Sequence, residues 1–452
     1  MQSRRNFLLA GLGLSAATLT LPGIACAALA KDVPTFRAGA GRADVSFPPS
    51  LFPLDGFTGV HDPLAVRVLL LDDGRARVGM VVIDLTSISD GMITSTKAIL
   101  SGTAGVLPAN AIVCAGHSFA TPHVFVGGHV PADTDLSRND AMRQAFEAAI
   151  RTAAAQAASS LEPARLGFGE GTSRVSVNRD IPTPYGWWLG ANDAGFVDPF
   201  LGVMRVDDRN GKPLAVLMNV AVQPSVMDGS QLAAGGKSIS ADLAGAAARR
   251  VESHYPGAVA FFILGAAGDQ SPYLQANRHV IGDGGVVGRV GLHEAGFTLL
   301  ELLGERLAAD VVAVAGSIET RSAPTLQVVR EHVQLQGVDF SPRNAPVGPV
   351  TAFKYRPGAK IEEPVVLVQM GSIAFVGVRP ELAATIGSRI RAGSPYPHTI
   401  VGTMVDGGAK YLPDAQSYDR FTYEARNSPY APGTAEELAN AVVGKLTQMH
   451  GR

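Results

Sequence analysis

Three of the ten histidines in this 452-residue chain lie within thirteen residues of each other. They are His117, His123 and His129, and His117 follows the apolar run 111–115 and Gly116, which together have the length and boundary of a buried strand. Neutral imidazole is the commonest nitrogen ligand for zinc and a frequent general base. The sequence therefore makes His117 a candidate for metal binding or catalysis, and the alternative is a loop histidine held by hydrogen bonds.

Two other predicted strands also end in polar residues. The apolar run 78–84 ends at Asp84, whose carboxylate could face a site or close an Asx turn. The run 258–264 is followed by small residues and then by Asp269 and Ser271. Because sites in α/β proteins are built at strand ends, these side chains are further candidates. For Ser271 the alternative is a turn residue before a proline.

The N-terminus has the pattern of a twin-arginine export signal. The motif SRRNFL at residues 3–8 is followed by an apolar segment rich in Gly and Ala and by the small-residue cleavage site ALA at 28–30. We therefore expect residues 1–30 to be a signal peptide, recognised by the twin-arginine export machinery, and residues 31–452 to be the mature domain. The expected location is the periplasm or the outside of the cell.

Only two cysteines are present, Cys26 and Cys114. Cys26 lies within the predicted signal peptide, so we expect no internal disulfide in the mature protein although it goes to an oxidising compartment. Residues 23–26 are similar to a lipoprotein cleavage box, which leaves lipidation of Cys26 open. Since the twin-arginine route carries folded proteins, a metal inserted before export is compatible with this signal.

The composition indicates a large core and a weakly charged surface. Hydrophobic residues make up 46% of the chain and charged residues 17%, with a net charge of −2. A chain this neutral has no electrostatic footprint for nucleic acid. No run after the signal approaches ~20 apolar residues, so no transmembrane segment is expected in the mature chain. We find no linker, charge block or internal repeat, which favours a single large domain.

Apolar runs separated by turn residues predict a mixed α/β fold. The turns at 72–74 and 207–212 each join two strand-like runs, which indicates antiparallel hairpins. Thr434, with Glu437 three residues on, predicts a capping box at the start of the last helix. We expect roughly ten strands and four or five helices, arranged as mixed sheets flanked by helices. The expected strands are 66–71, 78–84, 201–206, 214–222, 258–264, 326–335, the hairpin 365–378 and 399–405, and the main expected helices are 141–161, 242–255, 292–314 and one from 434.

Seven short segments, in the same order, resemble the neutral/alkaline (non-lysosomal) ceramidase family. The resemblance extends from Ala38 to about Glu424 and implies the mixed α/β catalytic domain of that family. The segments are GRADVS at 41–46, GVHDPL at 59–64, VNR at 177–179 with Tyr185, VDP at 197–199 leading to Asn219, GDQSP at 268–272, RPE at 379–381, and the stretch from Tyr411 to Glu424.

The resemblance implies a zinc-dependent amidohydrolase, in which a water activated by the metal attacks an amide carbonyl. The four metal ligands of the family fall on His117, Gln223, Glu381 and Tyr411, and three of these match in type. Zinc lowers the pKa of its water towards ~7 and polarises the carbonyl. One zinc ion per chain is therefore the expected cofactor.

The resemblance also implies residues that act on the substrate. Arg179, Ser271 and Tyr423 match positions that stabilise the oxyanion and hold the substrate in the family. Asp269 is a further catalytic candidate, which we expect to shape the loop or to support the groups of the site. For Arg179, the alternative is a salt bridge with Asp180 or another carboxylate. The substrate is expected to be a small-molecule or lipid-like amide that contacts Phe119, Arg179 and Tyr423.

The sequence departs from the family at several functional positions. Gln223 replaces a zinc-binding histidine, and an amide oxygen is a weaker zinc ligand than imidazole. Phe119 replaces a second histidine, which predicts a pocket for an apolar or aromatic group beside the scissile bond. Leu243 and Ala244 replace an Asn-Lys pair after Asp242. The resemblance also stops before the ~100-residue β-sandwich that follows the catalytic domain in full-length ceramidases.

These departures leave two hypotheses. The first is an exported, metal-dependent hydrolase of amide bonds, or of ester bonds, that acts on a substrate other than ceramide. The second is a non-catalytic protein that keeps the ceramidase fold and a ligand pocket.

Overall fold

A computed structural model describes residues 36–127, 130–131, 134–322, 325–341 and 347–451. The predicted signal peptide, 1–30, and His129 lie outside the described residues. From Phe36 onward the described chain forms one compact unit.

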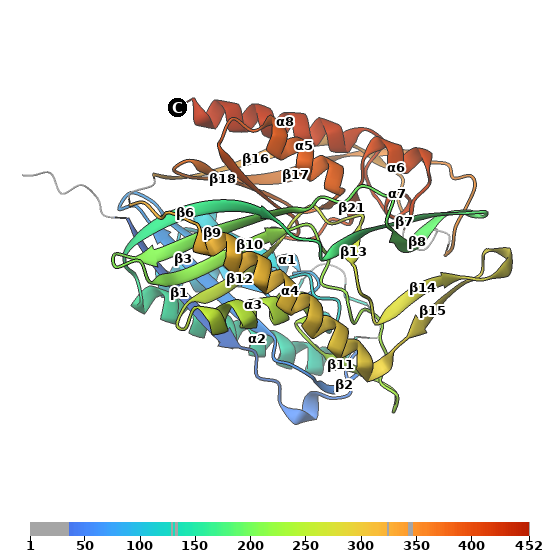
Figure 1. The fold of residues 1–452 in the computed structure, drawn as a ribbon, viewed down its shortest axis with the longest axis horizontal. Coiled ribbons are helices and arrows are strands. Elements are labelled where there is room, and N and C mark those ends of the chain that lie inside the picture. Colours follow the sequence, from blue (N-terminus) through green and yellow to red (C-terminus); the bar gives the residue numbers. More distant parts are fainter. Residues whose placement is uncertain (1–35, 128–129, 132–133, 323–324, 342–346, 452) are drawn as a thin grey trace, which may run out of the picture. The chain divides into compact units, whose positions relative to one another are not determined.

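The largest element is an eight-stranded mixed sheet (Figure 1). Its inner pairs are antiparallel, and its two edge strands are each parallel to their neighbour. Several strands are apolar runs without alternation, as expected for a sheet that is covered on both faces. The strands, in spatial order, are β12 (Val259–Leu264), β10 (Pro213–Val220), β9 (Phe200–Asp208), β6 (Glu162–Thr172), β1 (Arg37–Asp44), β3 (Ala65–Asp72), β4 (Arg77–Ile83) and β5 (Ala111–Ala115).

Four helices cover one face of this sheet and share a hydrophobic core with it. The covering helices are α1 (Asp90–Ala104), α2 (Leu136–Ser159), α3 (Asp242–His254) and α4 (Gly296–Gly316). Glycines in β1 let helix α2 pack close to the sheet. A Cβ at Gly39 or Gly41 would lie only 2.1 Å from a carbonyl oxygen of that helix.

A second, four-stranded sheet packs on the other face, so two sheets lie between two helical layers (Figure 1). One hydrophobic cluster joins the two sheets, and another joins the second sheet to the C-terminal helices. The second sheet contains, in spatial order, β16 (Leu326–Val338), β17 (Pro357–Met370), β18 (Ile373–Val378) and β20 (His398–Gly402), and it is covered by α5 (Ala384–Gly393) and α8 (Thr434–His450).

Short strands and helices at one end of the sheets complete the fold. They are β2 (Phe57–Val60), β7 (Ser176–Thr183), β8 (Gly186–Asn192), β11 (Lys237–Ile239), β13 (Gln270–Pro272), β14 (Asn277–Ile281), β15 (Val287–Gly291), β19 (Glu381–Leu382), β21 (Tyr411–Leu412), α6 (Ala415–Asp419) and α7 (Tyr423–Arg426). The prediction of ten strands missed them, and most of them, though not β7 and β8, have five residues or fewer and are too short to show a sequence period.

The predicted mixed α/β class and the three predicted hairpins are confirmed. The capping box at Thr434 is wrong. Gly433 occupies the N-cap position with a left-handed φ of 86°, and the Thr434 hydroxyl donates to the carbonyl of Ala431 instead of capping the helix. Two helix boundaries also differ, since α2 starts five residues before the predicted position 141 and α4 starts at Gly296 rather than 292.

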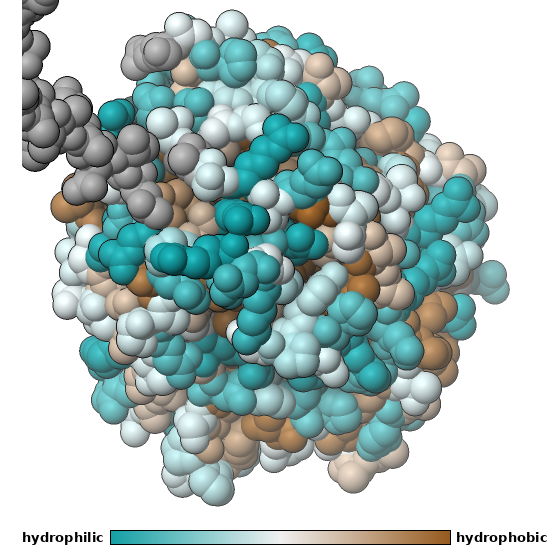
Figure 2. All heavy atoms as spheres, turned by 60° about the vertical axis from the view of Figure 1, so that its left-hand side comes forward, coloured by the Kyte–Doolittle hydropathy of each residue, from teal (hydrophilic) through white to brown (hydrophobic). Residues whose placement is uncertain are grey.

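The surface agrees with the low fraction of charged residues. On the face drawn in Figure 2, hydrophilic side chains predominate and hydrophobic ones form small separate patches. No helix among the described residues is long and apolar enough to cross a membrane.

Candidate active site

The buried edge strand β5 places His117 in a tight turn at its C-terminal end. The histidine has a left-handed φ of 58°, and its backbone N–H donates to the carbonyl of Leu85, 2.9 Å away. Its side chain is buried, and Nδ1 lies 2.6 Å from the carbonyl oxygen of Thr86. Because a carbonyl oxygen can only accept, Nδ1 carries a hydrogen, and the lone pair of Nε2 is the one that can bind a proton or a metal.

That lone pair faces a carboxylate. Nε2 of His117 lies 3.1 Å from Oε2 of Glu381, and among the described residues no hydrogen-bond partner satisfies Nε2. Two lone pairs at this distance repel each other unless a proton or a metal cation lies between them. The arrangement is the one found in metal sites, in which a backbone carbonyl fixes the tautomer of the ligating histidine.

Tyr411 lies beside Glu381 because the two residues pair across the parallel strands β19 and β21. The phenol of Tyr411 is buried, and its pKa is raised above the ordinary value by burial and by the Glu381 carboxylate, while the Arg179 guanidinium opposes this shift. Three groups with oxygen or nitrogen lone pairs, those of His117, Glu381 and Tyr411, therefore line one cavity.

Gln223 follows β10 and connects two charged groups. Its side-chain Nε2 donates to Oε2 of Glu381 at 2.5 Å, and its Oε1 accepts from Arg179 at 2.7 Å. Turning the amide over would place its oxygen against the carboxylate and its NH2 group against the guanidinium, so the two neighbours fix its orientation. In this orientation the amide oxygen points to Arg179. We call the connected residues Arg179, Gln223, Glu381 and His117 the polar wall.

Arg179 in β7 is the buried cation of the polar wall. It forms a 2.5 Å ion pair with Glu424, and its guanidinium carbon lies 5.1 Å from the ring centre of Tyr411 and 5.7 Å from that of Tyr423. Burial alone lowers the pKa of this side chain, but Glu424, Tyr411 and Glu381 outweigh it and raise the pKa well above the ordinary value. Arg179 therefore stays charged, and the predicted alternative of a salt bridge is realised with Glu424.

The catalytic candidates Asp269 and Ser271 do not line the cavity. The Asp269 carboxylate accepts from the backbone N–H of Ala384 at 2.8 Å and from Asn178 at 3.2 Å, and burial raises its pKa to about 7. These contacts tie β7 and α5 to the loop, in line with a loop-shaping role. Ser271 is buried in β13, where it pairs with Val177 of β7.

The cavity beside the polar wall has a volume of about 360 Å³. The Phe119 ring packs edge-on against the His117 ring with 4.8 Å between the ring centres, and it makes this side of the cavity apolar. The lining residues are Thr86, Ser87, His117, Phe119, His123, Glu381, Met404, Gly408, Ala409, Lys410, Tyr411, Tyr423 and Asn427.

Tyr423 projects into the cavity from the first turn of α7. Its ring is held between those of Trp188 and Tyr411, with ring centres 5.7 and 5.9 Å away. Burial raises the pKa of its phenol, so the O–H remains a hydrogen-bond donor at neutral pH. The two tyrosines that were singled out by their twelve-residue spacing thus lie next to each other.

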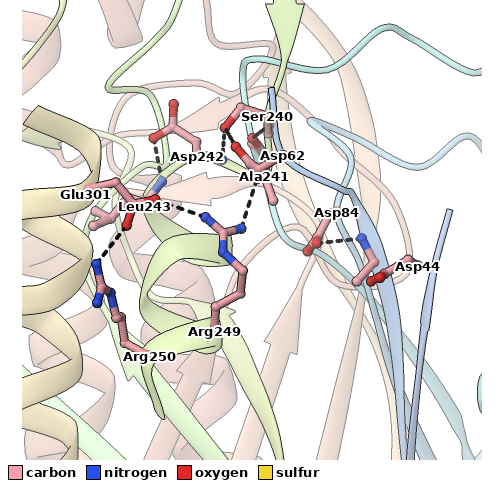
Figure 3. A network of polar contacts seen from close by, with 12 residues as sticks. Asp44, Asp62, Asp84, Ser240, Ala241, Asp242, Leu243, Arg249, Arg250 and Glu301 are labelled. Atoms are coloured by element: carbon pink, nitrogen blue, oxygen red, sulfur yellow. Dashed lines mark hydrogen bonds and ion pairs between the residues drawn. The ribbon is translucent and has the colours of Figure 1, made fainter. Parts of the chain in front are cut away.

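A second set of charged and polar groups, drawn in Figure 3, is connected to the loop of His117 through Ser118. Ser118 donates to the carbonyl of Ser240 at 2.9 Å, and Ser240 donates in turn to the Asp62 carboxylate. Asp62 also accepts from Arg249 at 2.9 Å, and the Asp242 carboxylate accepts from three backbone N–H groups. We call Asp62, Ser240, Asp242 and Arg249 the support network.

Asp84, at the end of β4, has a structural role. Its carboxylate accepts from the Ala65 backbone N–H at 2.9 Å and forms a buried ion pair of 3.0 Å with Arg67. It therefore does not face the cavity, although it stands at a strand end next to β5. His123 does line the cavity, but its side chain is largely exposed and lies 4.0 Å from Asp55.

Two functional neighbours escaped the sequence analysis. Thr86 matters only through its backbone carbonyl, which sets the tautomer of His117, and no side-chain motif reports such a role. Glu424 is the last residue of the last segment that resembles the ceramidase family. Its ion pair with Arg179 joins residues 245 positions apart, so only the fold reveals it. Among the described residues, no three His, Cys, Asp or Glu side chains come together as a metal site.

Comparison with solved structures shows which fold this is. The chain matches a structure titled "Ceramidase complexed with C2" with a TM-score of 0.71 and 19% identity over 92% of this chain and 76% of the other. It matches the crystal structure of neutral ceramidase from Pseudomonas aeruginosa with a TM-score of 0.70 and 18% identity over 93% of this chain and 75% of the other. No protein-family profile and no curated protein sequence matches. The chain therefore has the fold of these ceramidases.

Proposed function

We propose that this protein is a ceramidase-like hydrolase that cleaves the amide bond of an N-acylated amine in the cavity beside the polar wall. The observation that carries this proposal is the 3.1 Å approach of His117 Nε2 to the Glu381 carboxylate, with Tyr411 paired beside Glu381, an arrangement that a proton or a bound metal cation would stabilise. The ceramidase fold supports the same reaction class.

We further propose that zinc is this cation and that His117, Glu381 and Tyr411 hold it. One imidazole, one carboxylate and one phenol oxygen make three protein ligands, the number that catalytic zinc sites use while they leave a fourth position open. When bound, zinc would lower the pKa of a water molecule and polarise the amide carbonyl. Gln223 would orient the Glu381 carboxylate through its NH2 group rather than serve as a strong ligand.

The remaining groups then act on the substrate. Tyr423 has its O–H in the cavity and would donate to the oxygen of the amide as negative charge develops there. Arg179 would stabilise that charge from behind the two tyrosine rings and keep Gln223 and Glu424 in place. Phe119 would bind an apolar or aromatic group beside the scissile bond, which favours a substrate other than ceramide.

The place of action is also a proposal. The twin-arginine pattern at residues 3–8 supports export to the periplasm or beyond, with the metal inserted before translocation. An epitope-tagged full-length chain should appear in the periplasmic fraction. Lys substitution of Arg4 and Arg5 should retain it in the cytoplasm.

Metal analysis of protein purified from the exported fraction tests the function. We expect about one zinc per chain, lost in His117→Ala and kept in His254→Ala, which removes an exposed histidine at the end of α3. Acyl amides, amino-acid amides and aryl esters are then compared with and without a chelator. Full metal content in His117→Ala would overturn the ligand set.

A parent protein without metal and without turnover would support the non-catalytic alternative. If long-chain ceramide in detergent is much the best substrate, the inference from Phe119 is wrong.

A further inference from the structure

Two lysines that form no ion pair with the described residues lie at the cavity or in the pocket next to it. Lys410 lines the cavity itself, and Lys237 lines the small pocket that adjoins it across Phe119. The Lys237 ammonium nitrogen lies 4.2 Å from the ring centre of Phe57. Within the part of the chain that the structure describes, no carboxylate lies within 4.0 Å of either ammonium group, although most charged groups of the site are paired.

Lys410 is held firmly next to the proposed chemistry. It precedes Tyr411, and its carbonyl oxygen accepts from the Glu381 backbone N–H at 2.8 Å. Its φ is 59°, in the left-handed region that a residue with a long side chain rarely adopts. A glycine would adopt this conformation without strain, whereas Lys410 adopts it at a cost in backbone strain.

The other charges at the mouth do not neutralise the two lysines. Asp55 is exposed, and its carboxylate accepts a hydrogen bond from the backbone N–H of His123 at 3.2 Å. Asp228 forms a 3.0 Å ion pair with Arg289. Partial desolvation lowers the pKa of His123, the charges of Lys237 and Lys410 lower it further, and Asp55 opposes them. Asp55 and Asp228 both raise the pKa of Lys237 through their charge, but among the described residues neither carboxylate forms an ion pair with it.

An apolar surface lies directly beside these cations. Phe119, Met404 and Ala409 line the cavity next to Lys410, and Phe57, Phe119 and Phe297 line the adjoining pocket next to Lys237. Burial lowers the pKa of Lys237, which shows that its ammonium group is partly withdrawn from water. A partly desolvated cation without a counter-ion is stabilised by an anionic ligand. A ligand that suits this mouth therefore combines an apolar chain with a negative group.

We propose that the substrate is an N-acyl amino acid, in which Lys410, assisted by Lys237, binds the carboxylate and the apolar side of the cavity binds the acyl chain. This inference rests on the proposed amide hydrolysis. Because Lys410 is adjacent to Tyr411, a carboxylate on the amine side would lie near the scissile amide. Water adds across that bond, so the products are the fatty acid and the free amino acid, with no further reactant.

The test compares N-octanoylglycine with N-octanoylglycinamide, which differ in the charge of one group. Binding is measured by calorimetry on the full-length mature protein carrying His117→Ala, so that turnover does not interfere. We expect the acid to bind at least tenfold more tightly than the amide, and we expect this preference to shrink as salt increases. Adding Lys410→Gln should abolish the preference, and adding Lys237→Gln should reduce it. Lys360→Gln, an exposed lysine of β17, is the matched control and should leave it unchanged.

The same two compounds separate this inference from the proposed function. Equal binding of acid and amide, or a preference that survives Lys410→Gln, overturns the N-acyl amino acid proposal. If the acid is preferred through Lys410 but the parent protein hydrolyses neither compound, the anion site stands and the hydrolase proposal fails. If the parent hydrolyses both at equal rates and binds both equally, the hydrolase proposal stands and the anion site fails.

Discussion

The support network and the polar wall are both rich in charge and, apart from the half-buried Arg249, both are buried, but they differ in how their polar atoms are satisfied. In the support network, Asp62 accepts from a hydroxyl, a backbone N–H and a guanidinium, and Asp242 accepts from three backbone N–H groups. In the polar wall, Nε2 of His117 faces a carboxylate and has no partner among the described residues. A satisfied network stabilises a fold, whereas an unsatisfied buried group points to a missing ligand.

Adjacent strand ends show the same contrast. Asp84 ends β4 and is neutralised by Arg67, while His117 follows β5 and turns towards the cavity. Both are polar residues at the end of an apolar run, so sequence position alone does not separate them. We expect paired residues such as Asp84 to control stability and residues that face the cavity, such as His117, to control chemistry.

The largest expected effect is on stability at the Arg67–Asp84 pair. Arg67→Met leaves a buried carboxylate without its cation and should lower the free energy of unfolding by about 3–5 kcal/mol. Urea denaturation measures this loss, with the exposed Arg75→Met as control, expected within about 0.5 kcal/mol of the parent. Metal content of the folded variant should not change. A loss below about 1 kcal/mol would show that this pair does not stabilise the fold.

The next effect concerns the two tyrosines of the cavity. Tyr423→Phe keeps the ring between Trp188 and Tyr411 but removes the donor, so turnover should fall by ~10²-fold or more while folding and metal content stay intact. Tyr411→Phe should instead lower the metal content. Steady-state kinetics and elemental analysis distinguish the two. If both variants match the parent in both measurements, the polar wall is not a catalytic site and the non-catalytic alternative is preferred.

A smaller effect is expected at Gln223. Gln223→His exchanges a weak ligand for an imidazole and should tighten zinc binding about tenfold or more, which competition with a chelator measures. Gln223→Ala is the companion variant, because it also removes the contacts with Arg179 and Glu381 but supplies no ligand. Equal zinc affinity in the His and Ala variants would mean that position 223 does not reach the metal.

The smallest effect is a pH dependence of stability that arises in the support network. Burial raises the pKa of Asp242 to about 6 in the folded protein. Because the unfolded carboxyl group ionises at lower pH, the folded state binds more protons between the two pKa values, and stability is lost as pH rises from ~4 to 6. The contribution of Asp242 to this slope should be at most about 1.4 kcal/mol per pH unit, and the slope should fall by that amount in Asp242→Asn, while the contribution of Asp269, whose pKa is about 7, remains. An identical slope in the variant would assign the titration to another group.

The amino-acid sequence by itself determined the architecture and the order of the chemical groups. Continuous apolar runs such as Ala111–Ala115 require strands buried on both faces, and the turns after Asp72 and Asp207 produce the two long hairpins. Local pattern suffices here because hydrophobic period and turn residues act over a few positions. The same patterns missed β19 and β21, which have two residues each and no period, and they misplaced the cap of α8, where the conformation of Gly433 decided.

Only the tertiary structure decided which of the candidate residues meet. Asp84 and His117 were equivalent by position, and packing assigned the first to Arg67 and the second to the cavity. Gln223 was expected as a ligand, but its amide orientation depends on Arg179 and Glu381, which lie 44 and 158 positions away. Hydrogen-bond direction, tautomer and burial arise from neighbours that the folded chain brings together. The sequence supplies these groups, and their chemistry follows from the contacts that the fold imposes.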